Sequence, residues 1–500
     1  MRRSVKRLVS GVAVTALAAL GTGGAAAAPA AASVAQVIPF STGHIIAAHS
    51  LAQPPTTAQC EANYGIACYQ ADQIQTAYNL APLFARGDEG QGSTIAVLDA
   101  FGSPSIASDL KVFDKAMGLP DPSLTVITPE GPITTTAKTC TSTFSPTGPD
   151  TCSDYYGWTD ETSLDVEWAH TIAPRANILL VETPMTETEG IYGFPQLIAA
   201  ENYVIDHHLA DVITQSFGAA ENTFASPSQI YSLRSAYFNA AEHGVTVLAS
   251  SGDQGSTDYY CSPASGCANP GDVICCTSSP TIDWPSSDPL VTAVGGTQLH
   301  LNASGQRTSA DSVWDDLSST IGVSGPVYTW GASGGGRSAV FPRPKFQDSV
   351  TRTVGNRRGT PDISMSAAVN GAVDYYDTSD PSTNGWSIVG GTSEASPLFS
   401  GIVALADTAA GHSLGDLNPT LYKLAHRGAK SGIVPISSGT NTFIFCPPAD
   451  TNSNSSCASA SDLVTVPGST ANGGYNNATG WGTVNAAAFV PALARAAGGY

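Results

Sequence analysis

Apolar and polar positions follow two patterns along the chain. Short runs that are apolar almost throughout, typical of strands buried on both faces, occupy residues 93–101, 176–183, 210–218, 245–253 and 289–299. Between these runs, apolar residues recur every three or four positions, which predicts amphipathic helices at 105–119, 194–208 and 229–244. Buried strands that alternate with helices indicate a mostly parallel, doubly wound sheet with helices on both faces. We therefore predict an α/β fold in a single large domain.

The N-terminal region departs from this pattern. Four basic residues within the first seven precede an apolar stretch at about 8–20 and an alanine-rich zone. This arrangement predicts a secretory signal peptide at 1–28, because the apolar stretch is too short to span a membrane. Residues 29–69 are rich in Pro, Ala and Thr and weakly patterned, so we expect a short segment there and the folded domain at 70–500. The predicted protein is secreted and has no membrane anchor.

Ten cysteines agree with export, since disulfides persist in oxidising compartments. They occur in close sets, and we expect disulfides within three of these: Cys60 with Cys68, Cys140 with Cys152, and Cys446 with Cys457. A fourth set comprises Cys261, Cys267, Cys275 and Cys276. We favour two disulfides over a zinc site there, because the spacings and the secreted context suit loops better than a metal.

The charge balance narrows the possible partners. The chain holds 41 acidic and 21 basic residues, for a formal net charge of −20, and removing the basic leader makes the remainder more acidic. This excess of negative charge argues against binding to nucleic acid or to anionic membranes. It fits activity at low pH, and it fits solubility alone equally well.

The segment "GGTSEASP" at 390–397 is the first candidate for chemistry. It follows 386–391, which we expect to be a late segment of the sheet, and it precedes a helix, so the turn would present Ser393. A serine hydroxyl needs a base to become a nucleophile. None of the nine histidines lies in a setting suited to that role, and His170, late in a helix, is better explained as a partner of the helix dipole.

Carboxylates are the remaining bases. Glu161 and Asp165 stand four residues apart, on one face of a helix that we expect Thr159 or Asp160 to cap. Two ionised carboxylates at this spacing repel by roughly 0.2–0.5 kcal/mol on an exposed helix, and a shared proton would relieve the repulsion and raise one pKa. Two solvated acids near a helix start remain the alternative on spacing alone.

Two further aspartates stand at the ends of predicted strands, where sites in open α/β sheets gather. Asp253 lies in "SSGDQGS", at the end of the strand predicted at 245–253. Asp99, in "IAVLDAFG", resembles the aspartate strand of subtilisins, but we interpret it as a sheet-end residue because the matching histidine is missing.

Three segments in order, "ETSLDVEWAHTIAP", "SSGDQGS" and "GGTSEASP", resemble the sedolisin family of serine-carboxyl peptidases. The segments "VTAVGGT", "PDISMSA" and "YNNATGWGTVN" extend the likeness over roughly residues 70 to 490. The resemblance implies a subtilisin-like fold and an acid-active endopeptidase that acts on proteins or peptides. We expect such an enzyme to be a monomer.

The resemblance also implies a role for each candidate residue. Ser393 would be the nucleophile, Glu161 would accept its proton, and Asp165 would hold and polarise Glu161. Asp253 would serve the oxyanion site as a neutral acid that donates a hydrogen bond, together with the backbone N–H of Ser393.

The chain departs from the family pattern in three places. Family members carry a large folded prosegment, whereas only about 40 residues separate the predicted signal from the predicted core here. The family also has a calcium site built partly from two aspartates, and Pro435 and Asn476 stand in their places, so we predict no metal or other cofactor. Glu394, directly after the nucleophile, is unusual, and we favour an outward-facing side chain near the helix dipole over a role in substrate choice.

Two alternatives remain open from the sequence. One is a subtilisin-type serine peptidase that uses a relocated histidine. The other is a degenerate peptidase fold that only binds, which is disfavoured because all four expected catalytic positions are filled.

Overall fold

The computed structural model describes residues 51–142, 151–187, 192–257, 279–320, 327, 329–381, 383–445 and 460–497. The predicted signal peptide, the four clustered cysteines, Cys446, Cys457, His44 and His49 lie outside these residues.

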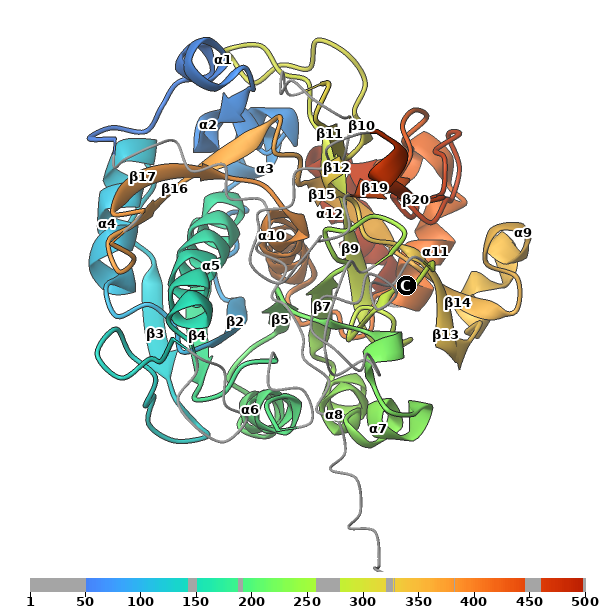
Figure 1. Ribbon diagram of the computed structural model, residues 1–500, viewed down its shortest axis with the longest axis horizontal. Coiled ribbons are helices and arrows are strands. Elements are labelled where there is room, and N and C mark those ends of the chain that lie inside the picture. The colour runs from blue at the N-terminus through green and yellow to red at the C-terminus, as the bar shows by residue number, and fades with distance from the viewer. Residues whose placement is uncertain are drawn as a thin grey trace, which may run out of the picture. The chain divides into compact units, whose positions relative to one another are not determined.

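The described residues form a central sheet of eight strands, in the order β10-β9-β7-β5-β2-β4-β3, with β15 paired to β9. Every neighbouring pair is parallel except β10 with β9. The strands are β2 (Thr94–Ala100), β3 (Ser123–Ile127), β4 (Asn177–Thr183), β5 (Val212–Gln215), β7 (Thr246–Ser250), β9 (Thr292–Gln298), β10 (Ser312–Val313) and β15 (Ile363–Ser366). Each of the five predicted strands therefore lies in this sheet (Figure 1).

The helices fill the connections between strands and the end of the chain. They are α1 (Thr57–Tyr64), α2 (Ala71–Ala77), α3 (Ala81–Phe84), α4 (Ile106–Met117), α5 (Cys152–Ile172), α6 (Phe194–Asp206), α7 (Pro227–Ser232), α8 (Ser235–His243), α9 (Thr351–Val354), α10 (Thr392–Ala410), α11 (Asn418–Ala425) and α12 (Ala486–Ala497). The helix predicted at 229–244 is divided into α7 and α8. None of the helices in the described ranges is both long and apolar enough to cross a membrane.

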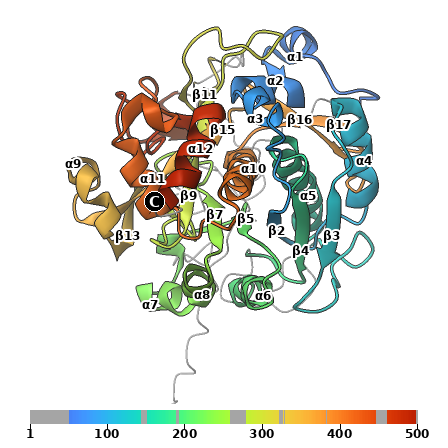
Figure 2. The same cartoon turned by 180° about the vertical axis from the view of Figure 1, so that it is seen from behind.

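The sheet is covered on both faces because successive strand residues point to opposite sides. In β2, Ile95 and Val97 belong to one hydrophobic cluster, whereas Ala96 and Leu98 belong to another. The first cluster includes residues of α4, α5, α10 and α12, and the second includes residues of α6 and α8. Figures 1 and 2 show α5 and α10 side by side on one face, and α6 and α8 on the other. The predicted doubly wound α/β fold is confirmed.

The start of α5 corrects the sequence prediction. Thr151, not Thr159 or Asp160, is the N-cap, and its side chain accepts a hydrogen bond from the Asp154 backbone N–H at 3.0 Å. Thr159 lies inside the helix and donates its hydroxyl to the Tyr156 carbonyl at 2.9 Å, a bond that keeps a threonine compatible with helix. Glu161 therefore lies in the middle of α5, where the dipole of the helix terminus does not reach it.

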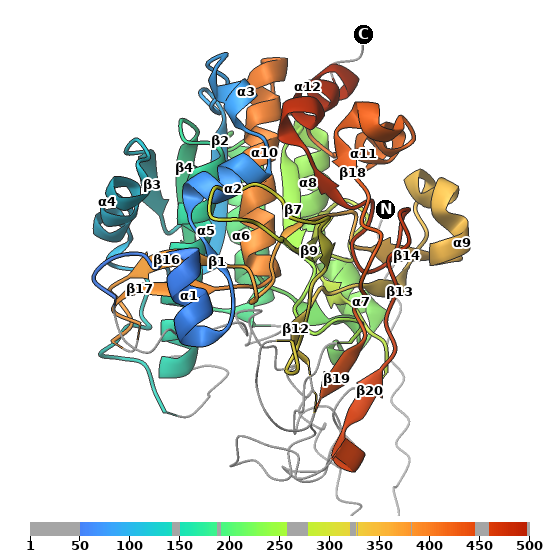
Figure 3. The same cartoon turned by 90° about the horizontal axis from the view of Figure 1, so that it is seen from above.

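The strand before Ser393 also differs from the prediction. Residues 386–391 do not extend the central sheet, because β17 (Gly385–Val389) folds back on β16 (Ala372–Asp377) as an antiparallel pair. Together with β1 (Cys68–Tyr69) they form a separate three-stranded sheet, seen beside α1 in Figure 3. The other small sheets are pairs: β6 (Ala219–Ala220) with β8 (Asp283–Trp284), β11 (Asp315–Leu317) with β12 (Thr329–Ala332), β13 (Gly336–Pro342) with β14 (Arg357–Thr360), β18 (Ile433–Val434) with β21 (Thr483–Val484), and β19 (Phe443–Phe445) with β20 (Val464–Val466).

Two disulfides support the edges of the fold, as predicted. Cys60 of α1 is bonded to Cys68 of β1, and Cys140 to Cys152 at the start of α5. A helix and a strand thus precede residue 70, where we expected the folded domain to begin.

A fully buried ion pair joins the central sheet to its neighbours. Arg358 makes a two-pronged contact with Asp362, in which its Nη1 lies 2.6 Å from Oδ1 and its Nη2 2.5 Å from Oδ2. Asp362 also accepts hydrogen bonds from the Ala293 backbone N–H of β9 and from the Tyr422 hydroxyl, both at 2.9 Å. The aspartate of the "PDISMSA" segment is therefore a structural residue.

We predict that Asp362→Ala lowers the free energy of unfolding by about 3–5 kcal/mol, because it leaves a buried guanidinium unpaired. Urea denaturation at pH 5 measures the change. The control is Arg343→Ala, which removes a pair with the exposed Asp348 and is expected to cost less than about 1 kcal/mol. Equal losses in the two variants would contradict this assignment.

Candidate active site

The turn before Ser393 depends on two glycines. Gly391 has φ +147°, and a Cβ there would lie 2.7 Å from Asp253 Oδ2. Its backbone N–H donates to the Ala367 carbonyl at 2.7 Å, and a Cβ on Gly390 would lie 2.8 Å from the same oxygen. Only glycine allows this close approach and this conformation together. The turn places Ser393, 1% exposed, in the first turn of α10, where backbone N–H groups lack partners within the helix.

The structure brings Glu161 and Asp165 to this turn from α5. Burial raises the pKa of Glu161 and the nearby Ser393 hydroxyl opposes that rise, while burial and the charges of Asp99 and Glu161 raise the pKa of Asp165. By strict geometry, Ser393 Oγ and Glu161 Oε1 have no hydrogen-bond partner among the described residues. Contacts between catalytic groups often tighten only when substrate binds.

Ser216 connects these groups. It follows β5 directly, and its hydroxyl lies 2.9 Å from Asp165 Oδ1 and 3.4 Å from the Ser393 carbonyl oxygen. The sequence analysis did not single out this residue. Its position at the carboxyl end of a central strand was the available signal, since Asp99 lies in the last two residues of β2 and Asp253 lies shortly after β7.

Asp253 approaches the turn with its two oxygens in different settings. Oδ1 accepts hydrogen bonds from the backbone N–H of Thr392 at 2.8 Å and from its hydroxyl at 2.7 Å. Oδ2 has no partner among the described residues and lies against Gly391, two residues before Ser393 in the chain. Since both donors occupy Oδ1, a proton on this carboxyl group is expected on Oδ2. Thr392, which fixes this arrangement, was also missed from the sequence.

Burial raises the pKa of all these carboxyl groups. It raises the pKa of Asp253 to about 7, against the opposing effect of the Thr392 hydrogen bonds. It also raises the pKa values of Glu161 and Asp165 well above the ordinary range, and the charges of neighbouring carboxylates add to the effect. None of the ion pairs in the described part of the chain joins a Lys or Arg to these groups. The cluster therefore cannot carry a full set of negative charges.

Asp99 belongs to this cluster, although we interpreted it only as a sheet-end residue. It is fully buried, and burial raises its pKa to about 7, against the opposing effect of the nearby Thr162 hydroxyl. Among the neighbouring charges, that of Asp99 acts most strongly on both Glu161 and Asp165. Asp99 lies opposite Glu182 of β4 in the sheet register, so the central strand itself delivers it to the site.

The described histidines are engaged elsewhere. His170 is fully buried near the end of α5, with Nε2 2.8 Å from the Pro120 carbonyl oxygen and 3.3 Å from Asp114 Oδ1. Side-chain or ring contacts away from Ser393 occupy the other histidines within the described ranges, His207, His208, His243, His300, His412 and His426. The geometry thus gives no support to a histidine base.

Glu394 does not face outward, so the interpretation we favoured was wrong. Its side chain is fully buried, because every residue from Thr392 to Asp407 on α10 is buried and the helix has no exterior face there. Burial raises its pKa well above the ordinary range.

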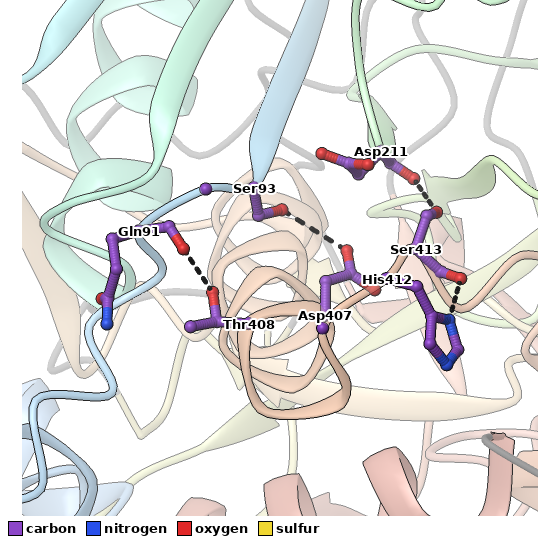
Figure 4. A pocket seen from close by; sticks show the side chains of 9 residues that line it. Gln91, Ser93, Asp211, Asp407, Thr408, His412 and Ser413 are labelled. Atoms are coloured by element: carbon purple, nitrogen blue, oxygen red, sulfur yellow. Dashed lines mark hydrogen bonds between the residues drawn. The ribbon is translucent and has the colours of Figure 1, made fainter.

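A separate cavity of about 290 Å³ lies at the opposite end of α10 (Figure 4). It is lined by Ser93, Asp211, Asp407 and His412 among others. The Asp407 carboxyl group accepts hydrogen bonds from Ser93 Oγ at 3.4 Å and from the Leu414 backbone N–H at 3.0 Å, and burial raises its pKa to about 8. This cavity lies at the amino ends of β2 and β5, away from Ser393.

The residues present do not fit the calcium site of the resembling family. Asn476 donates its amide to the Gly474 carbonyl at 3.1 Å and to Thr479 Oγ1 at 3.0 Å, and its oxygen accepts from the backbone N–H groups of Ala478 and Thr479. An N–H donor stands where a cation would need an anionic oxygen. In the described part of the chain, no group of three acidic, histidine or cysteine side chains could hold a metal ion.

The family model described as "Subtilase family" matches residues 156–482 of this chain. Among curated proteins, the chain is 33% identical over 348 residues to kumamolisin of Bacillus sp. (strain MN-32), a match that covers 68% of this chain and 53% of that protein. It is 32% identical over 247 residues to sedolisin of Pseudomonas sp. (strain 101), covering 49% and 38% respectively.

Tripeptidyl-peptidase 1 of Homo sapiens is 28% identical over 347 residues, covering 67% of this chain and 51% of that protein. The chain thus spans about half the length of these relatives, or less.

A solved structure described as Pseudomonas sedolisin, a serine-carboxyl proteinase complexed with two molecules of pseudo-iodotyrostatin, matches with a TM-score of 0.63. The identity is 24%, and the match covers 85% of this chain and 97% of that one. At this identity the likeness concerns the fold alone, and it confirms the subtilisin-like architecture.

We predict that the free energy of unfolding falls as pH rises from about 4 to above 7. A carboxyl group whose folded pKa is raised is neutral in both states below the unfolded pKa. Above that value, the unfolded state ionises first and gains stability. Asp253 alone, raised from 3.8 to about 7, accounts for a loss on the order of 4 kcal/mol. Urea denaturation of the wild type and of Asp253→Asn across this range measures it; the stability difference between them should change with pH by that amount. A difference independent of pH would contradict the raised pKa.

We also predict that calcium does not stabilise the protein. Dialysis against EDTA should leave the melting temperature unchanged within about 1 °C, because the Asn476 side chain already makes hydrogen bonds to polar groups of its own loop. Calcium that survives dialysis at one ion per chain, or a rise of several degrees in the melting temperature on adding it, would contradict this prediction.

Proposed function

The chain belongs to the subtilase family, in its sedolisin group, and from this membership we propose that it is a secreted, acid-active serine-carboxyl endopeptidase. The proposed reaction is hydrolysis of peptide bonds through an acyl-enzyme on Ser393. One observation carries the proposal: Ser393 at the start of a helix lies near the buried carboxyl pair of Glu161 and Asp165 and near Asp253. Asp253 accepts hydrogen bonds through one carboxyl oxygen, and its other oxygen has no partner among the described residues. The relatives' names support the reaction class, although the chain spans only part of their length.

Ser393 Oγ attacks the carbonyl carbon of the scissile bond, and its proton passes to Glu161. Asp165, held by the Ser216 hydroxyl, orients and polarises Glu161. When the tetrahedral intermediate collapses, Glu161 gives the proton to the leaving amine, and the acyl-enzyme remains. A water molecule then attacks the ester while Glu161 takes its proton, and that proton returns to Ser393 Oγ as the acid product leaves.

The oxyanion of each intermediate lies between two donors in this scheme, the Ser393 backbone N–H and Asp253 Oδ2–H. A carboxyl group can donate only while it is neutral, and the burial that raises the pKa of Asp253 to about 7 keeps it neutral in acid. Removal of one such donor typically costs about 2.7–4 kcal/mol of barrier stabilisation. Burial disfavours the ionised forms of these carboxyl groups, and it thereby keeps Asp253 protonated at low pH. Activity at low pH is the expected consequence.

Glu161 must ionise for catalysis while its neighbours stay neutral. The Ser393 hydroxyl favours the ionised form of Glu161, whereas the charges of Asp99, Asp253 and Glu187 oppose it. Asp99, Asp165 and Asp253 are therefore assigned the protons, which leaves a single negative charge for Glu161. This distribution needs an acidic medium, because each added ionisation raises the cost of the next.

Export belongs to the proposal. Two disulfides and the signal-like leader at 1–28 support an oxidising destination. Protein and peptide substrates follow from the reaction class. The proposed domain assignments are a leader at 1–28 and a peptidase domain that begins before residue 70, because α1 and β1 precede that residue and β1 pairs with β16.

We predict that the purified protein cleaves a peptide library in the acid range and loses activity as pH rises through about 7, where Asp253 gives up its proton. Ser393→Ala and Glu161→Gln should each abolish detectable turnover, since one removes the nucleophile and the other its base. Mass spectrometry of the digest measures both the cleavage and its pH profile.

Asp253 supplies the matched comparison. Asp253→Ala should reduce kcat by about 10²–10³, whereas Asp253→Asn keeps an N–H donor and should retain more activity above pH 7 than the wild type does, relative to each enzyme's maximum. Cleavage that survives in Ser393→Ala, or full wild-type activity at pH 8, would refute the scheme. A complete lack of cleavage at every pH would favour a fold that only binds.

A further inference from the structure

Glu394 is a buried acid with no part in the proposed chemistry. It follows the nucleophile directly and lies in the same first turn of α10. Its side chain is fully buried, and by strict geometry neither carboxyl oxygen has a hydrogen-bond partner among the described residues. An ionised carboxylate in such a setting is costly unless a cation accompanies it.

The groups around Glu394 supply no cation. On the β15 side, the Ser366 hydroxyl is the polar group that favours its ionised form, and the backbone N–H of Ser366 donates to the Tyr78 hydroxyl at 2.7 Å. Tyr78, at the end of α2, is fully buried and is affected by the charge of Glu394. Arg307 lies beyond the Tyr78 ring, 5.8 Å from its centre, and is already paired with Asp311.

The other faces of this turn are equally uncharged or acidic. From α5, Glu161 and Asp165 face the Ser393 side, and Asp253 bonds Thr392. From β5, Thr214 shares a hydrogen bond with the Ser396 hydroxyl at 2.7 Å. The residues of β9 and β15 include no titratable side chain. Among the described residues, a negative charge on Glu394 would therefore have only the Ser366 hydroxyl to stabilise it.

We propose that Glu394 is a positioning residue, which keeps the first turn of α10, and with it Ser393, packed against β15 only while its carboxyl group is neutral. The inference rests on the proposed function for its catalytic consequence. It extends that function with a second effect of pH, distinct from the protonation of Asp253. Deprotonation of Asp253 removes an oxyanion donor at once and reversibly, whereas deprotonation of Glu394 requires the turn to move before the charge reaches water.

The direction follows from the burial. Below the pKa of an unfolded glutamate, about 4.3, Glu394 is neutral whether the turn is packed or open. As pH rises above that value, the open turn ionises and is stabilised relative to the packed turn, until the packed form ionises too. The activity lost at once in a brief assay at neutral pH thus reports the deprotonation of Asp253. The activity lost slowly during prolonged incubation reports the deprotonation of Glu394.

The experiment incubates the enzyme at pH 7.5 and assays residual activity at pH 4 over time. The wild type should lose activity progressively, and Glu394→Gln, which cannot ionise, should lose it at least ten times more slowly with KM at pH 4 unchanged. Glu394→Met, a second uncharged variant of similar length, should behave in the same way and covers the case in which the glutamine variant fails to fold.

Glu201→Gln is the matched control. Glu201 is also buried, both of its carboxyl oxygens lack partners in the described part of the chain, and burial raises its pKa well above the ordinary range. It lies on α6, across the sheet from α10. Replacing Glu201 should stabilise the protein against global unfolding at pH 7.5. Activity and the tryptophan fluorescence of the folded state should then be lost with the same ratio of rates as in the wild type. Equal protection by Glu394→Gln and Glu201→Gln would overturn the proposal, since global unfolding would then explain the loss.

Hydrogen exchange separates this proposal from the proposed function. After correction for intrinsic rates, the backbone amides of Glu394, Ala395, Ser396 and Leu398 should lose protection between pH 4 and pH 7.5 in the wild type and keep it in Glu394→Gln; Pro397 between them has no amide proton. This readout needs no activity, so it decides the role of Glu394 even if no peptide is cleaved. Unchanged protection in the wild type would overturn the proposal, whatever the result of the peptide assay.

Discussion

The burial of carboxyl groups beside one another, without accompanying cations, is the constraint on which the rest of this structure depends. Asp99, Glu161, Asp165 and Asp253 arrive from three different elements and are all buried. Each ionisation therefore makes the next more costly, and burial raises every one of their pKa values. A group of this kind is stable and useful in acid, where protons replace the missing cations.

The backbone conformation before α10 determines which carboxyl oxygen of Asp253 can carry a proton. The conformation of Gly391 allows Asp253 to approach the start of α10, and Thr392 then commits one carboxyl oxygen with two hydrogen bonds. The other oxygen is left to carry a proton beside Ser393. Glu394 lies in the same turn, directly after the nucleophile. Under the proposal, its neutral side chain keeps this turn packed, while Glu161 and Asp165 approach Ser393 from α5.

The fold could be predicted well from the sequence, because a strand buried on both faces appears as a short run of apolar residues. The five predicted strands lie in the central sheet, and both disulfides in the described ranges join the expected cysteines. The four candidate site residues were found by motif, and they lie together. The cap of α5 at Thr151 is a local contact with Asp154 and was missed because the helix was expected to begin later. The pairing of β17 with β16, and the positions of Ser216 and Asp99 beside Asp165, were not foreseen because they depend on contacts between separate segments. The burial of Glu394 was missed for the same reason, since local pattern does not reveal that α10 is enclosed.

The most direct test of this account is the protonation state of Asp253. Infrared difference spectra between the wild type and Asp253→Asn, recorded from pH 3 to pH 9, isolate the carbonyl stretch of this one carboxyl group. The account predicts a protonated band that persists at pH 5 and disappears around pH 7. A carboxylate band already complete at pH 5 would contradict it, because the oxyanion donor would then be charged throughout the acid range.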